Sequence, residues 1–71
     1  MANVAQLELP ASAVKIGDRL DDGQIVVGVS TVKEEGIVVR ALELAWTPTG
    51  RISETRAVNV TDVLTVQRDH G

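Results

Sequence analysis

The chain has 71 residues with a formal net charge of −3, and it contains no Cys and a single His. Disulfides, thiolate metal sites and His-rich metal sites are therefore excluded, and no cofactor is expected. The mild acidity argues against non-specific binding to DNA or RNA, which depends on Lys and Arg to neutralise phosphates. No apolar run approaches the roughly 20 residues of a membrane helix, and residues 1–6 lack the basic and apolar segments of a secretory signal. A cytoplasmic location is the expectation.

The composition favours strands. Valine is the commonest residue, and Ile and Thr add further β-branched side chains, which pack well on a pleated sheet. We expect one domain, residues 1–71, in which residues 68–71 form a flexible tail. A domain of this size buries only about 60% of its unfolded surface. Because disulfides are excluded, oligomerisation is the remaining way to supplement a thin core, and we expect a homo-oligomer.

The first third of the chain predicts a strand, a turn and a hairpin. Residues 4–9 alternate between apolar and polar, and Pro10 ends this strand because it cannot donate to a ladder. Residues 11–14 predict a turn or a single helical turn. The Asp22-Gly23 pair is a strong hairpin signal, because Gly accepts the positive φ of a tight turn.

The middle of the chain predicts the longest hairpin. Residues 24–33 form an apolar strand in which Gly28 indicates a bulge, and residues 33–36 form the polar turn. The next strand, residues 37–46, has two apolar faces, one with Ile37, Val39 and Ala41 and the other with Leu42, Leu44 and Trp46. Either a bulge near Arg40 switches the buried face, or both faces are covered, one of them by a partner subunit.

The last third predicts two more strands. Residues 47–50 form a turn with Pro48 at its first central position, and residues 51–60 form a strand. Residues 59–63 resemble a short helical turn, and residues 64–67 form the final strand. Five or six short strands separated by turns predict an all-β fold, a small barrel in which closure of the sheet removes its edges.

Two stretches of the chain resemble SH3-like barrels. Residues 13–20, Ala-Val-Lys-Ile-Gly-Asp-Arg-Leu, run into Asp22-Gly23 and resemble the turn that feeds the first long hairpin of such barrels. Residues 60–66 are similar to the helical turn and last strand that close them. The resemblance implies a five- or six-stranded SH3-like barrel with one short helical turn before the last strand. In style the sequence is also similar to short accessory proteins of actinobacterial phages, which implies a location in the host cytoplasm.

A second resemblance, to Sm-like proteins, implies a different function. The residues that carry it are Leu20, Asp22, Gly23 and Gly28, which are similar to the apolar-Asp-Gly and later Gly of an Sm-like strand pair. The chain departs from that family at an RNA-binding position, because Ala57-Val58-Asn59 stands where an Arg-Gly pair is expected. The alternative function is therefore a barrel that binds nucleic acid or a nucleotide at a subunit interface.

Three acidic side chains lie close together in the sequence: Asp18, Asp21 and Asp22. Their spacing does not match an EF-hand loop, and Asp in turns commonly accepts hydrogen bonds from nearby backbone N–H groups. We interpret them as turn residues, and no metal site is expected. Glu43 and Glu54 are placed to face each other across a hairpin. We expect ion pairs of Glu54 or Glu43 with Arg56 rather than paired catalytic carboxylates.

The chain offers no nucleophile and base that form a catalytic set, so we expect a non-enzymatic protein. His70 lies next to the C-terminus, where a tail is the default. Trp46 is the only Trp in the chain, which contains no Phe and no Tyr. It serves either as an anchor of the core or as an exposed contact for a partner, a role in which Trp is enriched.

Our leading hypothesis is a protein-binding or assembly module that self-associates and contacts a host or virion protein through residues 42–56. The candidate interface comprises Arg40, Leu42, Leu44, Trp46, Arg51 and Arg56. In the alternative function, the three arginines hold a phosphate or nucleotide between subunits.

Overall fold

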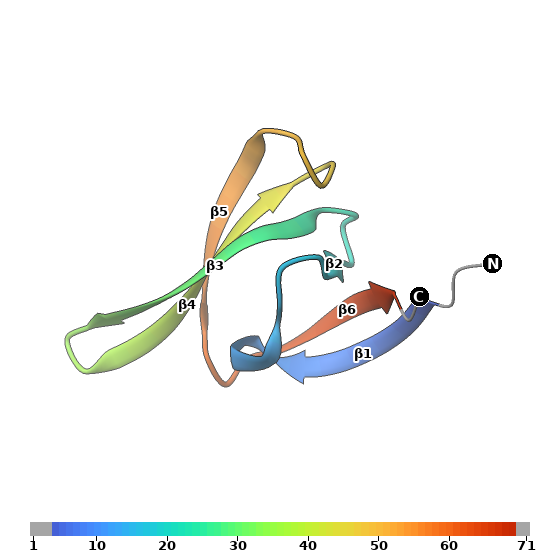
Figure 1. Ribbon diagram of the computed structural model, residues 1–71. Coiled ribbons are helices and arrows are strands. Elements are labelled where there is room, and N and C mark those ends of the chain that lie inside the picture. Colours follow the sequence, from blue (N-terminus) through green and yellow to red (C-terminus); the bar gives the residue numbers. More distant parts are fainter. Residues whose placement is uncertain (1–3, 70–71) are drawn as a thin grey trace.

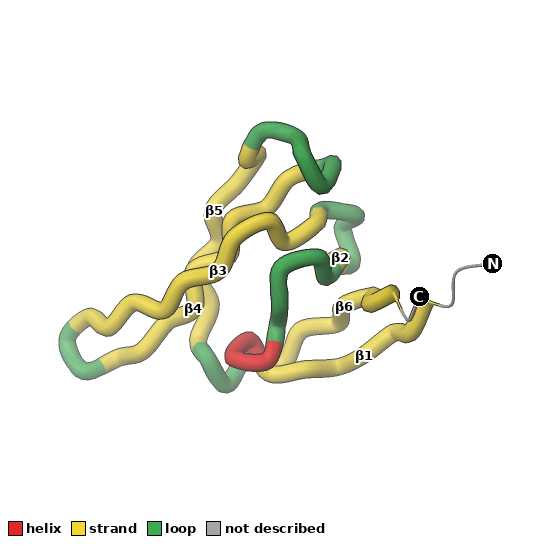
Figure 2. Tube along the Cα trace, viewed as in Figure 1, coloured by secondary structure: helices red, strands yellow, loops and turns green. Residues whose placement is uncertain are grey.

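The computed structural model describes residues 4–69, which fold into antiparallel strands and one short 3₁₀ turn (Figures 1 and 2). The prediction of an all-β fold is confirmed. The elements are β1 (Val4–Pro10), η1 (Ala11–Ala13), β2 (Arg19–Leu20), β3 (Ile25–Glu34), β4 (Ile37–Ala45), β5 (Ile52–Asn59) and β6 (Val63–Asp69). Within residues 4–69, no helix is long and apolar enough to cross a membrane.

The six strands of the described chain belong to one open sheet with the order β1-β6-β2-β3-β4-β5. Because β1 and β5 each pair on one side only, they are the edges of the sheet, and the prediction of a closed barrel is wrong. The sheet curls instead, so that β1 and β6 lie apart from β3, β4 and β5, with the short β2 between the two groups (Figure 1). Closure would require β5 to pair with the free side of β1, and no such pairing occurs among the described strands.

The 3₁₀ turn lies near the N-terminus and not before the last strand, which corrects the prediction for residues 59–63. It occupies residues 11–13, where the sequence predicted a turn or a single helical turn. The N–H groups of Ala11 and Ser12 donate to carbonyl groups of the β5–β6 connection, at 2.8 Å and 3.2 Å. That connection is a turn in which Asp62 N–H donates to Asn59 O at 3.0 Å. The carbonyl groups of Val60 and Asp62 accept hydrogen bonds from η1, and the connection does not continue as a helical turn.

β6 is longer than the sequence predicted. It pairs with β1 from Val63, opposite Pro10, to Asp69, opposite Val4. Residues 68 and 69 therefore continue the strand, and the prediction that they belong to a flexible tail is wrong. His70, with the tail position expected for it, lies outside the described residues.

The core of the described chain is aliphatic. Its buried apolar side chains are Ala11, Val14, Leu20, Ile25, Val26, Leu42, Leu44, Ala45 and Val66. Half-buried side chains from both groups of strands pack against this cluster, among them Leu7 of β1, Val58 of β5 and Leu64 of β6. The curl of the sheet therefore folds its inner face around a single core.

Two irregularities in the sheet set which faces are buried. The predicted bulge at Gly28 is confirmed, because the β3–β4 register shifts there and the Glu43 side chain lies against the Gly28 backbone. The register of β4 runs without a shift past Arg40, so the predicted bulge near Arg40 is wrong. The second shift lies farther along β4, between Leu44 and Ala45, where it pairs with β5.

The β3–β4 hairpin projects beyond the core (Figure 1). Its turn uses positive φ values at Glu35 (50°) and Gly36 (80°). Val32, Ile37 and Val38 near this turn are exposed, by 39%, 59% and 37%. One end of β4 thus presents apolar side chains to solvent while its other end is buried, and coverage of this tip by a partner subunit stays a prediction.

Candidate functional site

A polar network connects the β2–β3 turn to β5 at the edge of the sheet. Its centre is Gln24, which is 3% exposed. The Gln24 side-chain NH₂ donates to Asp22 Oδ2 at 3.0 Å and to Glu54 Oε1 at 2.9 Å, and its carbonyl oxygen accepts from Ser53 Oγ. Arg56 completes the network by donating to Glu54 at 2.8 Å and to Asp22 at 3.1 Å. The turn is therefore fastened to the edge strand by side chains alone.

The contacts of this network fix its charge states. Hydrogen bonds from Arg56 and then Gln24 hold the pKa of Glu54 below its ordinary value. The side chain and backbone of Gln24, followed by Arg56, lower the pKa of Asp22. Hydrogen bonds to Glu54 and Asp22 raise the pKa of Arg56. All three groups are charged near neutral pH, which suits ion pairing better than proton transfer.

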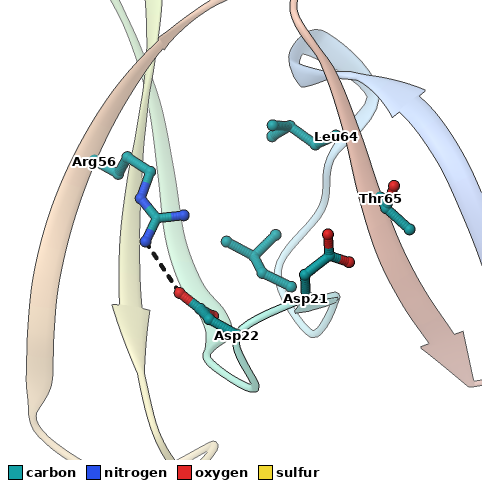
Figure 3. A pocket seen from close by; sticks show the side chains of 6 residues that line it. Asp21, Asp22, Arg56, Leu64 and Thr65 are labelled. Atoms are coloured by element: carbon teal, nitrogen blue, oxygen red, sulfur yellow. Dashed lines mark hydrogen bonds and ion pairs between the residues drawn. The ribbon is translucent and has the colours of Figure 1, made fainter.

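A small cavity lies beside this network, with Arg56 on β5 at one side and Leu64 and Thr65 on β6 at the other (Figure 3). Its volume is about 140 Å³, which is below the roughly 300 Å³ of the smaller ligand pockets. The guanidinium group of Arg56 points to Asp22 and not into open space (Figure 3). The cation that lines this cavity is therefore already committed to a carboxylate.

A second charged contact is made by Asp18, which is buried at 2% exposure. Arg68 donates to both of its carboxylate oxygens, at 2.8 Å and 2.7 Å, and Lys15 N–H donates to Oδ2 at 2.9 Å. Burial by itself raises the pKa of Asp18, but the hydrogen bonds from Arg68 and Lys15 outweigh it and hold the pKa below its ordinary value. This pair joins the loop before β2 to the end of β6.

The prediction that the acidic cluster consists of turn residues is confirmed at two of its members. Asp18 accepts from the backbone N–H of Lys15, and Asp22 accepts from that of Gln24 at 3.0 Å. Asp21 is exposed. Within the described part of the chain, no three His, Cys, Asp or Glu side chains are grouped so that they can hold a metal ion.

The predicted placement of Glu43 and Glu54 opposite each other across the hairpin is wrong. Glu43 lies opposite Thr55, whereas Glu54 lies opposite Leu44, so the two carboxylates are on different faces of the sheet. The same register puts Arg56 opposite Leu42, which excludes a cross-strand pair with Glu43. The other expected ion pair, between Glu54 and Arg56, is confirmed by its 2.8 Å contact.

Three of the six candidate interface residues are held inside the protomer. Leu42 and Leu44 are fully buried in the core, so neither belongs to the surface. Arg40 is half-buried, and its guanidinium donates to Thr31 Oγ1 and to the carbonyl of Val14, each at 3.2 Å. The face of β4 proposed as an interface is thus largely the inner face of the sheet.

Of the other candidate interface residues, Arg56 belongs to the polar network, and Trp46 and Arg51 are exposed at the β4–β5 connection. Trp46 is 60% exposed, and two residues outside the predicted set, Pro48 and Ile52, are exposed beside it, Ile52 by 50%. The predicted turn is confirmed, because Gly50 N–H donates to Thr47 O at 3.1 Å. We refer to Trp46, Pro48, Arg51 and Ile52 as the Trp46 surface.

Sequence reasoning missed the residues that organise the polar contacts. The sequence predicts Gln24 as the start of a strand, and it predicts a tail for Arg68, the partner of Asp18. The Arg68–Asp18 pair spans 50 residues and the Gln24–Glu54 bond spans 30. No local pattern marks contacts of such separation, because each depends on how the sheet curls.

The chain matches no protein-family model, no curated protein and no solved structure in comparisons with known proteins. The site is therefore interpreted from its own geometry.

Acid should destabilise this protein, and Asp18 should account for part of the effect. Because the pKa of Asp18 is lowered on folding, the unfolded chain takes up its proton first as the pH falls below the ordinary value of 3.8. The stabilisation is therefore complete above that pH and is lost below it. Thermal unfolding followed by circular dichroism between about pH 2 and pH 6 measures this. The Asp18→Asn variant should be less stable than the wild type at pH 6 and should lose less stability on acidification. An equal loss of stability in both proteins would contradict the role of Asp18 in acid sensitivity.

Proposed function

We propose that the protein is a non-enzymatic protein-binding and assembly module that contacts its partner through the Trp46 surface. The observation that carries this proposal is the position of Trp46. The described core contains no aromatic side chain, yet the one aromatic residue is 60% exposed. Burying an indole stabilises a domain by on the order of 3 kcal/mol. A small domain that leaves this stabilisation unused is explained best by a partner that covers the indole.

The neighbours of Trp46 support a contact with protein. Ile52 and Pro48 add exposed apolar area, and Arg51 adds a cation. Trp and Arg are enriched among the residues that dominate binding energy at protein interfaces. In the proposal the partner is a host or virion protein, and the chain also self-associates, because a core of this size gains from further burial.

The resemblance to SH3-like barrels belongs to the same proposal. The curled antiparallel sheet and its long β3–β4 hairpin support it, although the sheet is open. The similarity in style to phage accessory proteins favours a location in the host cytoplasm. Both resemblances are compatible with a module that works by contact.

The charges disfavour the alternative of a nucleic-acid or nucleotide binder. Arg40, Arg56 and Arg68 are engaged with the protein itself. The net charge of −3 opposes the approach of phosphates. A stacking platform for bases needs aromatic side chains, and the sequence has one.

Replacement of Trp46 by Ala should abolish partner contact and leave the fold intact. We expect affinity for the partner to fall by about 30-fold or more, the equivalent of 2 kcal/mol at a binding hot spot. The free energy of unfolding, measured by thermal melting, should change by less than about 1 kcal/mol, because the side chain is exposed. The wild type and the Trp46→Ala variant are each used to capture proteins from host extract, and the captured proteins are identified by mass spectrometry. The affinity of each captured protein is then measured for both the wild type and the variant.

Ile16→Ala is the matched control, because Ile16 is an exposed apolar residue, at 64%, on a different loop. It should capture the same partners as the wild type. Equal capture by the Trp46→Ala variant, or unfolding of that variant, would contradict the proposed contact surface.

A further inference from the structure

β5 is an edge strand whose sequence is complementary to itself. It pairs only with β4, so one row of its backbone N–H and C=O groups has no strand partner within the described chain. Its central residues read Glu54-Thr55-Arg56, an acid and a base on either side of one threonine. In an antiparallel pair of identical strands centred on Thr55, each Glu54 lies opposite an Arg56 of the other copy.

We propose that two copies of this chain pair through β5, antiparallel, with Thr55 opposite Thr55 of the second copy. The inference deepens the proposed assembly function, on which it rests, by naming the surface and the register of self-association. The product is one continuous sheet of two protomers related by a two-fold axis. Trp46, Pro48 and Arg51 of the Trp46 surface precede β5 and remain available to a different partner, whereas Ile52 is the first residue of β5 and lies opposite Val58 of the second copy.

Charge selects this register among the possible ones. Centring the pair on Glu54 or on Arg56 puts like charges directly opposite each other, which is destabilising. Centring it on Ala57 puts Arg56 opposite Val58, so neither Glu54 nor Arg56 gains an opposite charge from the second copy. Shifting the register by one residue puts the half-buried residues of one β5 strand opposite the exposed residues of the other. Only the Thr55 register opposes acid to base twice.

The charges on β5 also explain why other strands are excluded. Glu54 and Arg56 lie on the inner face of the edge and are 40% and 36% exposed as side chains. Glu54 and Arg56 pair with each other within the protomer, at 2.8 Å. Charges at such positions normally protect an edge strand from pairing, because a foreign strand places apolar or like-charged side chains beside them. A second copy supplies an opposite charge at each position, so the same residues that block other strands accept this one.

The other edge lacks this complementarity. β1 has a single charged residue within its bounds, Glu8, and it ends at Pro10, which has no N–H to donate. A pair of β1 strands therefore has no opposite charges to bring together. The observations favour β5 as the edge used for self-association.

Single cysteines test the register, since the chain has no cysteine of its own. In the proposed pair, Cα atoms of opposed residues lie about 4.5–5.5 Å apart, within the range of a disulfide. Thr55→Cys should therefore form a disulfide-linked dimer under mild oxidation. Ala57→Cys is the matched control, because it is also exposed on β5, but its Cα atoms in the two copies are separated by roughly 14 Å along the strand. We expect the Thr55→Cys dimer to form about tenfold faster or more than the Ala57→Cys dimer.

Charge reversal tests the same inference without cysteine. The variants Glu54→Arg and Arg56→Glu should each be monomeric by sedimentation at concentrations where the wild type is dimeric, because each opposes like charges. An equimolar mixture should form a heterodimer, because the all-basic edge then faces the all-acidic edge. Circular dichroism of each variant checks that it is folded, and the cysteine pair carries the test if one of them is not.

The outcomes separate this inference from the proposed function. A wild-type dimer in which Thr55→Cys and Ala57→Cys oxidise equally slowly overturns the β5 edge, while self-association stands. Faster oxidation of Ala57→Cys overturns the register. A wild-type monomer up to millimolar concentration overturns self-association and this inference together, while partner capture through Trp46 is unaffected.

Discussion

The Asp18→Ala variant should lose about 3 kcal/mol of folding stability. The substitution leaves the guanidinium of Arg68, which is 27% exposed, without the carboxylate that accepts two of its hydrogen bonds. It also leaves the N–H of Lys15 without its acceptor. The total free energy of unfolding of a domain of this length is roughly 4–10 kcal/mol. The melting temperature of the variant should therefore be far below that of the wild type. Denaturant unfolding followed by circular dichroism measures the loss.

Asp21→Ala is the control for this experiment. Asp21 is exposed, whereas Asp18 is buried three positions earlier in the chain. The control should change stability by less than about 0.5 kcal/mol. A loss at Asp18 as small as that at Asp21 would contradict the anchoring role of the Asp18–Arg68 pair.

The Leu44→Asp variant should fail to fold. Leu44 is fully buried in the aliphatic core, where a carboxylate loses its hydration at a large cost in folding free energy. The milder Leu44→Ala should cost about 2–5 kcal/mol. If Leu44 lay in a subunit interface, as the sequence predicts, Leu44→Asp would separate folded subunits. Its burial in the core predicts loss of the protomer itself, which circular dichroism distinguishes from dissociation of folded subunits.

Ile37→Asp serves as the comparison on the same strand. Ile37 is 59% exposed near the tip of the β3–β4 hairpin. The variant should stay folded, with a stability change of less than about 1 kcal/mol. A folded Leu44→Asp protein would contradict the placement of the inner face of β4 in the core.

Local chemistry in the sequence predicted the strands and turns well. Alternation located β1, the Asp22-Gly23 pair located the β2–β3 turn, and Gly28 located the bulge in β3. These features depend on residues that are neighbours along the chain or across one hairpin. Periodicity and turn preferences carry that information directly.

Closure of the sheet and the polar contacts depend on distant residues and were not predictable in the same way. Whether β5 meets β1 depends on how far the whole sheet curls, which alternation within one strand does not encode. The register of β4 with β5 decides that Arg56 faces the interior near Asp22 rather than Glu43. A shift of one residue would exchange these faces.

Trp46 shows the same limit at the candidate site. As one residue before a turn, it fitted both a core anchor and an exposed contact. The alternation of β4 placed it on the face of Leu42 and Leu44, which is the core face. β4 ends at Ala45, however, so the strand period no longer holds at Trp46 and its side chain is exposed.

Quenching of Trp46 fluorescence by acrylamide tests the central claim most directly, because this is the only Trp in a chain without Tyr or Phe. The measurement is made on dilute protein, at a concentration where sedimentation shows the protomer alone. We expect quenching close to that of free tryptophan in water, since the indole is exposed and available to a partner. Strong protection of the indole in the isolated, folded protomer would show that Trp46 is a core anchor and would contradict the proposed contact surface.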